Sequence, residues 1–174
     1  MSVKQLSPNL RRITAPNPGP MTGAGTNTYL VGSERVVVVD PGPAIPAHVE
    51  AIIEEANQKI EWIVVTHTHG DHSPAAAILA EKTGASCIGM LSAMPRFQDA
   101  SFKPDQTLTH HRVVETDTCR LKAIHTPGHV DNHFCLLLEE DGVLLAGDHL
   151  MNGSTVVIIP PQGDMRAYIP VSYT

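Results

Sequence analysis

Four residues that could bind metal ions lie close together in one stretch of the chain, His67, His69, Asp71 and His72, in the pattern H-x-H-x-D-H. In an extended backbone, His67 and His69 point to the same side, so both imidazoles can reach one ion at about 2.0–2.1 Å. Gly70 permits a tighter turn that would bring Asp71 and His72 toward a second ion. The chain has ten histidines but only three Phe, three Tyr and one Trp, so imidazole is unusually frequent. The stretch therefore predicts a metal centre.

Two later segments could supply the remaining ligands. His129 ends the turn Thr126-Pro-Gly-His129, and Asp148 follows a short apolar run. Either residue alone would be typical of a structural turn, but beside the H-x-H-x-D-H stretch both are predicted metal ligands. The donors are imidazoles and carboxylates without thiolate, so the predicted cofactor is one or two zinc ions, with manganese or iron as alternatives.

The other histidines favour roles away from the metal. His110 and His111 are adjacent in a polar stretch and are predicted to be exposed loop side chains. His133 is predicted to support the ligands or to be structural, and His48 sits near a helix start with no evident partner. His125 precedes the T-P-G-H turn and fits either interpretation.

Hydrophobic runs and turn residues predict the elements that hold these side chains. Apolar runs bounded by turn residues indicate strands at residues 9–14, 26–31, 36–39, 62–66, 119–125, 133–139 and 143–146. Helical spacing indicates helices at 46–56 and from 73 to about 82, and residues 91–106 have no clean period and are expected to be irregular. Pro46 suits a first helical turn, Ser73 can cap the second helix, and Gly84 can end it.

This order of elements predicts an α/β domain with helices packed on a sheet. A chain of 174 residues with 42% hydrophobic content is long enough for one compact domain, residues 1–174. The H-x-H-x-D-H stretch follows the strand predicted at 62–66, and open α/β sheets bind ligands at the carboxyl ends of their strands. The metal centre is therefore expected at that edge of the sheet.

Charge and hydropathy exclude two classes of protein. The formal net charge is −6, and no cluster of basic residues exceeds the pair Arg11-Arg12, so a broad nucleic-acid-binding face is not indicated. The longest aliphatic runs are far too short to cross a bilayer, and the first residues do not resemble a secretory signal. We therefore expect a cytoplasmic protein that does not enter membranes.

Three strings, T-H-T-H-G-D-H-S, T-P-G-H and G-D, occur in this order and resemble the motifs of the metallo-β-lactamase superfamily. The resemblance implies an αββα sandwich, and it makes the turn at Asp40 a support for the ligand loop. It also implies two metal sites, with His67, His69 and His129 at the first, Asp71 and His72 at the second, and Asp148 bridging them.

Asp148 also bears on the branch of the superfamily. Antibiotic-hydrolysing members tend to carry cysteine there, whereas the aspartate resembles the glyoxalase II-like and nuclease-like branches, and the string T-P-G-H-V-D-N-H is most similar to the β-lactamase-like protein 2 group. The resemblance implies a hydrolase in which a metal-bound hydroxide attacks a carbonyl (thioester or ester) or a phosphodiester, with Asp71 as the catalytic residue that orients the water. The alternatives are an endoribonuclease for single-stranded RNA and a shortened, catalytically silent metal-binding protein. The expected partner is accordingly a small-molecule or RNA substrate.

The carboxyl-terminal part departs from the family pattern. The family normally continues after the G-D motif with a helix, a strand and a last histidine that completes the second metal site, and these are not found after Asp148. We therefore expect a C-terminally incomplete sandwich with a short second sheet, no outer helix, and a second metal site with one ligand fewer. Pro170 is expected to interrupt the helical spacing of the tail, and an apolar strand at 156–159 is expected to be left open, which favours a homodimer.

Overall fold

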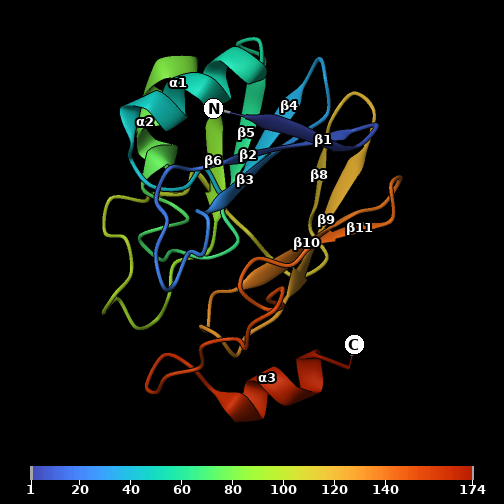
Figure 1. Ribbon diagram of the computed structural model, residues 1–174. Helices are drawn as coiled ribbons and strands as arrows, with labels where there is room; N and C mark the ends of the chain where they lie inside the picture. Colours follow the sequence, from blue (N-terminus) through green and yellow to red (C-terminus); the bar gives the residue numbers. More distant parts are fainter. Residues whose placement is uncertain (1, 174) are drawn as a thin grey trace.

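The computed structural model describes residues 2–173, which form two facing β-sheets with helices against one of them (Figure 1). The first sheet is seven-stranded, in the order β1 (Val3–Ser7), β2 (Leu10–Thr14), β3 (Asn27–Val31), β4 (Val36–Val39), β5 (Ile60–Val64), β6 (Ser86–Gly89) and β7 (Gln106–Thr107). Strands β1 to β4 pair antiparallel, and β4 to β7 pair parallel.

The second sheet is four-stranded and antiparallel, in the order β11 (Val143–Leu145), β10 (Phe134–Leu138), β9 (Arg120–His125) and β8 (Val113–Glu115). The helices are α1 (Pro46–Glu55), α2 (Ala75–Thr83) and α3 (Met165–Val171).

The valine run of β4 shows why the first sheet lies in the middle of the molecule. All four valines are buried, because the strand is covered on both faces. Val36 and Val38 belong to the core beneath the helices, whereas Val37 and Val39 belong to the core between the sheets. An uninterrupted apolar run is typical of a strand covered on both sides.

Each face of the first sheet has its own hydrophobic core. Val49 and Ile52 of α1 and Leu79 of α2 pack in the helix-side core. Phe134 and Leu136 of β10 pack in the core between the sheets. The layers thus run helix, sheet, sheet, and the expected α/β sandwich is confirmed. Within residues 2–173, α1 and α2 are the helices with extensive sheet or helix contacts, whereas α3 lies beyond the end of the second sheet (Figure 1).

Several local predictions are confirmed and others are wrong. Pro46 opens α1, and Gly84 ends α2 in the left-handed conformation with φ of 76°. Ser73 does not cap α2, because its hydroxyl donates a hydrogen bond to Asp99 Oδ2 instead. Pro170 does not interrupt the tail helix, which begins at the capping residue Asp164 and continues through the proline to Val171.

The strand expected at 156–159 is absent from the part of the chain that the structure describes. This segment is irregular, and Ile159 is 67% exposed. Strands β1, β6, β7 and β8 were not expected from the sequence. No helix within the described residues has the length and hydrophobicity to cross a membrane.

Candidate metal centre

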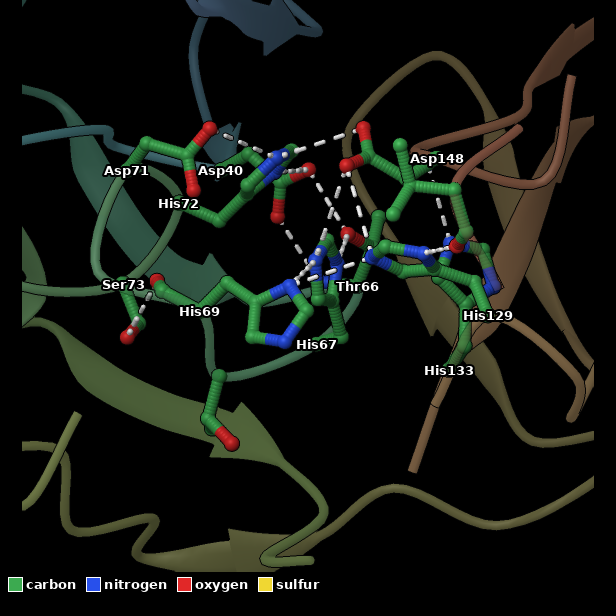
Figure 2. A network of polar contacts seen from close by, with 12 residues as sticks. Asp40, Thr66, His67, His69, Asp71, His72, Ser73, His129, His133 and Asp148 are labelled. Atoms are coloured by element: carbon green, nitrogen blue, oxygen red, sulfur yellow. Dashed lines mark hydrogen bonds and ion pairs between the residues drawn. The ribbon is translucent and has the colours of Figure 1, made fainter. Parts of the chain in front are cut away.

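The candidate metal centre lies where the loops after four strands meet at one end of the two sheets. Asp40 follows β4, the H-x-H-x-D-H stretch follows β5, His129 follows β9, and Asp148 follows β11. Figure 2 shows their side chains turned toward one another. The six residues predicted as ligands, which come from three separate segments, are therefore brought to one place by the packing of the two sheets.

Three imidazoles and one carboxylate oxygen form what we call the first donor set. His69 Nδ1 lies 3.1 Å from His67 Nε2 and 3.1 Å from His129 Nε2. Asp148 Oδ2 lies 3.5 Å from His129 Nε2 and 3.9 Å from His67 Nε2. Ligands bound tetrahedrally at about 2.0–2.1 Å from a zinc ion stand roughly 3.3 Å from one another. The spacing of these four atoms therefore suits one shared cation.

The hydrogen-bond partners of Nδ1 in His129 and in His67 show which nitrogen of each ring carries the hydrogen. His129 Nδ1 lies 2.6 Å from the carbonyl oxygen of Val157, which can only accept, so this nitrogen is the donor. Thr66 Oγ1 donates to Asp40, so the hydroxyl oxygen accepts from His67 Nδ1 at 3.1 Å. In the neutral form of each ring, the Nε2 atom then has a free lone pair directed at the centre.

Burial keeps the imidazoles of His67 and His69 in the neutral form that binds metal. Burial, together with the neighbouring histidines, holds the pKa of His67 well below its ordinary value. Burial and the proximity of His129 lower the pKa of His69 to about 4. His69 Nδ1 could donate a hydrogen to only one of the two facing nitrogens, so convergent lone pairs would remain unsatisfied without a cation. The residues present therefore fit a divalent transition metal.

The second donor set consists of His72, Asp71 and the other oxygen of Asp148. His72 Nε2 lies 3.4 Å from Asp148 Oδ1 and 3.6 Å from Asp71 Oδ2. Burial alone would lower the pKa of His72, but the carboxylates of Asp40 and Asp148 outweigh it and hold that pKa well above the ordinary value. Because a proton on Nε2 sits where a second cation would, metal binding there must displace it.

Asp40 is the residue behind both donor sets. The residue is 3% exposed, and its carboxylate accepts from the backbone N–H of Thr66 at 2.7 Å, from Thr66 Oγ1 at 2.8 Å and from His72 Nδ1 at 2.9 Å. It therefore fixes the orientation of His72 directly and that of His67 through the threonine. The backbone of Asp40 is left-handed, with φ of 48°, which aspartate tolerates better than most residues. The support expected from this acidic turn is thus present.

His133 has the supporting role that the sequence indicated. It is fully buried, its Nδ1 lies 2.8 Å from Thr126 Oγ1, and its Nε2 accepts from the backbone N–H of Asp148 at 3.1 Å. Gly147 makes this contact possible, because a Cβ there would lie 2.6 Å from His133 Nε2. His133 therefore sets the position of the Asp148 backbone.

Asn132 holds two of the loops at this site together, a role that the sequence pattern did not indicate. It is fully buried, and its Nδ2 donates to Thr68 Oγ1 and to the carbonyl oxygen of Met90, both at 2.8 Å. Thr68 separates His67 from His69, so the amide ties the loop after β9 to the loop after β5. Its place in the string T-P-G-H-V-D-N-H, three residues after His129, is the signal that could have identified it.

The remaining histidines lie outside the two donor sets. His48 is buried and has a partner after all, because its Nε2 lies 2.9 Å from Thr28 Oγ1. His110 and His111 are exposed, as predicted. His125 Nε2 lies 2.8 Å from the carbonyl oxygen of Asp131, so it is tied to the loop that carries His129. His149 is buried and packs against Tyr168.

Comparison with known proteins agrees with this geometry. The model of the metallo-beta-lactamase superfamily matches residues 21–174. An atrochrysone carboxyl ACP thioesterase from Aspergillus chevalieri is 34% identical over 165 residues, covering 89% of this chain and 50% of that protein. A beta-lactamase-like protein 2 homolog from Caenorhabditis elegans is 34% identical over 160 residues, covering 89% of this chain and 54% of that protein. The chain thus spans about half the length of these curated relatives.

The fold has solved counterparts as well. The crystal structure of TTHA1623 in a di-iron-bound form matches with a TM-score of 0.74 at 23% identity, covering 93% of this chain and 83% of that one. At this identity the likeness shows a shared fold. Because the family model covers most of the chain and the fold agrees with it, this protein belongs to the metallo-β-lactamase superfamily.

Proposed function

We propose that this chain carries the metal centre of a metal-dependent hydrolase that acts on thioesters or related carbonyl compounds. The observation that carries the proposal is the position of Asp148, whose two oxygens face different donor sets. Oδ2 faces His129 and His67, whereas Oδ1 faces His72. A carboxylate placed in this way can bridge two cations.

The residues divide naturally between two cations. The first donor set would hold one ion through three imidazoles, and the second donor set would hold another through Asp71 and His72, with Asp148 shared. Imidazole and carboxylate donors suit zinc, manganese and iron. Zinc is the cofactor we propose, and iron is the alternative that the di-iron form of TTHA1623 supports.

A pair of divalent cations, when bound, activates water as a nucleophile near neutral pH and polarises the oxygen of a carbonyl or phosphoryl group. Asp71 is the side chain best placed to orient that water. It is 31% exposed, in contrast to the buried His72 that it faces, so it can reach solvent and a bound substrate. We therefore propose Asp71 as both a metal ligand and the catalytic residue.

The substrate class rests on two observations. The relative from Aspergillus chevalieri is named as a thioesterase. The chain has a formal net charge of −6, with acidic residues outnumbering basic ones, which does not favour the long polyanionic contact that RNA requires. A thioester or ester substrate is therefore the proposal, and cleavage of single-stranded RNA is an alternative outcome of its test.

The test compares hydrolysis of acyl thioesters, aryl esters and single-stranded RNA by the zinc-loaded protein and by Asp71→Asn. We expect thioester hydrolysis that disappears on chelation and falls at least about 100-fold in the variant. The matched control is Asp117→Asn, an exposed aspartate that binds the turn at Ser33, at the opposite end of the first sheet. RNA cleavage in place of thioester hydrolysis would transfer the assignment to the nuclease alternative. Zinc binding without hydrolysis of any substrate would favour a silent metal-binding protein.

A further inference from the structure

The segment after Asp148 contacts the two loops that carry His129 and Asp148 at three points. Nδ1 of His129 donates to the carbonyl oxygen of Val157 at 2.6 Å. The backbone N–H of Asp164 donates to the carbonyl oxygen of Gly128 at 2.8 Å. The hydroxyl of Tyr168 donates to the carbonyl oxygen of His149 at 2.9 Å. Helix α3 is therefore joined to both segments of the second sheet that carry ligands.

Gly128 allows α3 to approach the ligand turn closely. Its φ is 146°, and a Cβ added there would lie 2.5 Å from the Cβ and 2.6 Å from the Cα of Tyr168. Only glycine leaves room for a backbone at that distance. The residue immediately before His129 thus packs directly against Tyr168, whose hydroxyl binds the residue after Asp148.

The segment 148–149 is held from two sides. On the side of the second sheet, His133 accepts the backbone N–H of Asp148. On the side of α3, the hydroxyl of Tyr168 holds the carbonyl oxygen of His149, and the two rings pack with centroids 4.8 Å apart. The hydroxyl group and the ring are separate contributions, so a substitution that removes one and keeps the other can tell them apart.

We propose that Tyr168 is a positioning residue for Asp148, and that its hydroxyl sets the affinity of the second donor set for metal. This inference rests on the proposed bridging role of Asp148. The first donor set retains three imidazoles when Asp148 shifts. The second has only Asp71 and His72 besides the shared carboxylate, so displacement of Asp148 weakens the second site more.

The experiment is a zinc titration of metal-free protein against a chromophoric chelator, for the natural chain and for Tyr168→Phe. We expect the first zinc ion to bind within about 2-fold of the natural affinity and the second to bind about 10-fold more weakly, since residues behind metal ligands typically contribute 10–100-fold. Tyr173→Phe is the matched control, because that side chain lies in the same segment and is 87% exposed. Cobalt(II) spectra of the same variants report the geometry of each site independently of affinity.

Each result decides a different point. Two zinc ions bound by Tyr168→Phe as tightly as by the natural chain would overturn the inference. Equal weakening of both sites, or loss of folded structure by circular dichroism, would show a general structural role and would also overturn it. A natural chain that binds no second zinc ion would instead overturn the bridging role of Asp148, and the inference with it.

Discussion

Replacing Asp40 by asparagine tests how far the metal centre depends on one buried carboxylate behind it. Asparagine tolerates the left-handed backbone at this position as well as aspartate does, so the substitution changes hydrogen bonding without adding backbone strain. Its amide nitrogen would face two groups that now donate to the carboxylate, the hydroxyl of Thr66 and Nδ1 of His72.

The magnitude follows from these contacts. A hydrogen bond to a charged imidazole contributes about 1.5–3 kcal/mol and a neutral one about 1 kcal/mol. We therefore expect the free energy of unfolding of the metal-free Asp40→Asn variant to fall by about 2.5–4 kcal/mol. The remaining oxygen of the asparagine must still accept from the backbone N–H of Thr66, so the amide nitrogen takes the position that faces His72. A nitrogen of this kind can only donate, so His72 would have to accept at Nδ1 and carry its hydrogen on Nε2, where the second cation would bind. Affinity for the second zinc ion should then fall about 10–100-fold.

Urea denaturation of the metal-free protein and zinc titration measure the two effects separately. Asp117→Asn is again the control, because Asp117 lies in the turn between β8 and β9 and binds the turn at Ser33, away from the metal centre, so zinc binding should remain unchanged. If Asp40→Asn bound its second zinc ion with natural affinity, the argument that Asp40 fixes the hydrogen position on His72 would be wrong.

Three other predictions follow from the same structure. Replacing both His67 and His69 by alanine should abolish tight binding at the first site, and equilibrium dialysis showing unchanged zinc stoichiometry would contradict the ligand assignment. Gly147→Ala combines a φ of 51° with a Cβ 2.6 Å from His133 Nε2, so it should lower the free energy of unfolding by about 2–4 kcal/mol, measured by urea denaturation. Its control is Gly142→Ala, where φ is 62° but the space around the glycine is open, so the free energy of unfolding should fall by only about 1–2 kcal/mol. Burial lowers the pKa of His67 and His133, so below about pH 6.5 the histidines of the unfolded chain take up protons that those of the folded chain do not. The free energy of unfolding of the metal-free protein should therefore fall as the pH drops from about 6.5 to 5, by up to about 1.4 kcal/mol per pH unit for each histidine. Urea unfolding curves that coincide across that pH range would refute this.

The local parts of the site could be predicted from the sequence because short-range geometry determines them. His67 and His69 are two residues apart on an extended segment, so their side chains must lie on the same side. Apolar runs such as that of β4 indicate strands for the same reason, since a strand buried on both faces needs an uninterrupted run. The helix boundaries at Pro46 and Gly84 depend on backbone preferences of single residues and were likewise predictable.

The predictions that were wrong concern places where contacts between distant segments decide the structure. Serine is a common helix cap, but the hydroxyl of Ser73 donates its hydrogen bond to Asp99, 26 positions away. The segment 156–159 has the composition of a strand, but it runs past His129 as irregular backbone and gives a carbonyl oxygen to that ring. In both places a tertiary contact outweighs a local preference that is small in energy.

The order of the residues alone predicts which donor atoms are available and how those within the H-x-H-x-D-H stretch are spaced. The packing of the fold brings His129 and Asp148 to this stretch and sets which nitrogen of His129 faces the centre. It also places the hydroxyl of Tyr168 on the carbonyl oxygen of His149. These contacts need the folded chain, because the distances between the segments are set by the packing of the two sheets against a common core. The hydrogen positions, in turn, are set by buried partners such as Asp40 and the carbonyl oxygen of Val157, which no local pattern identifies.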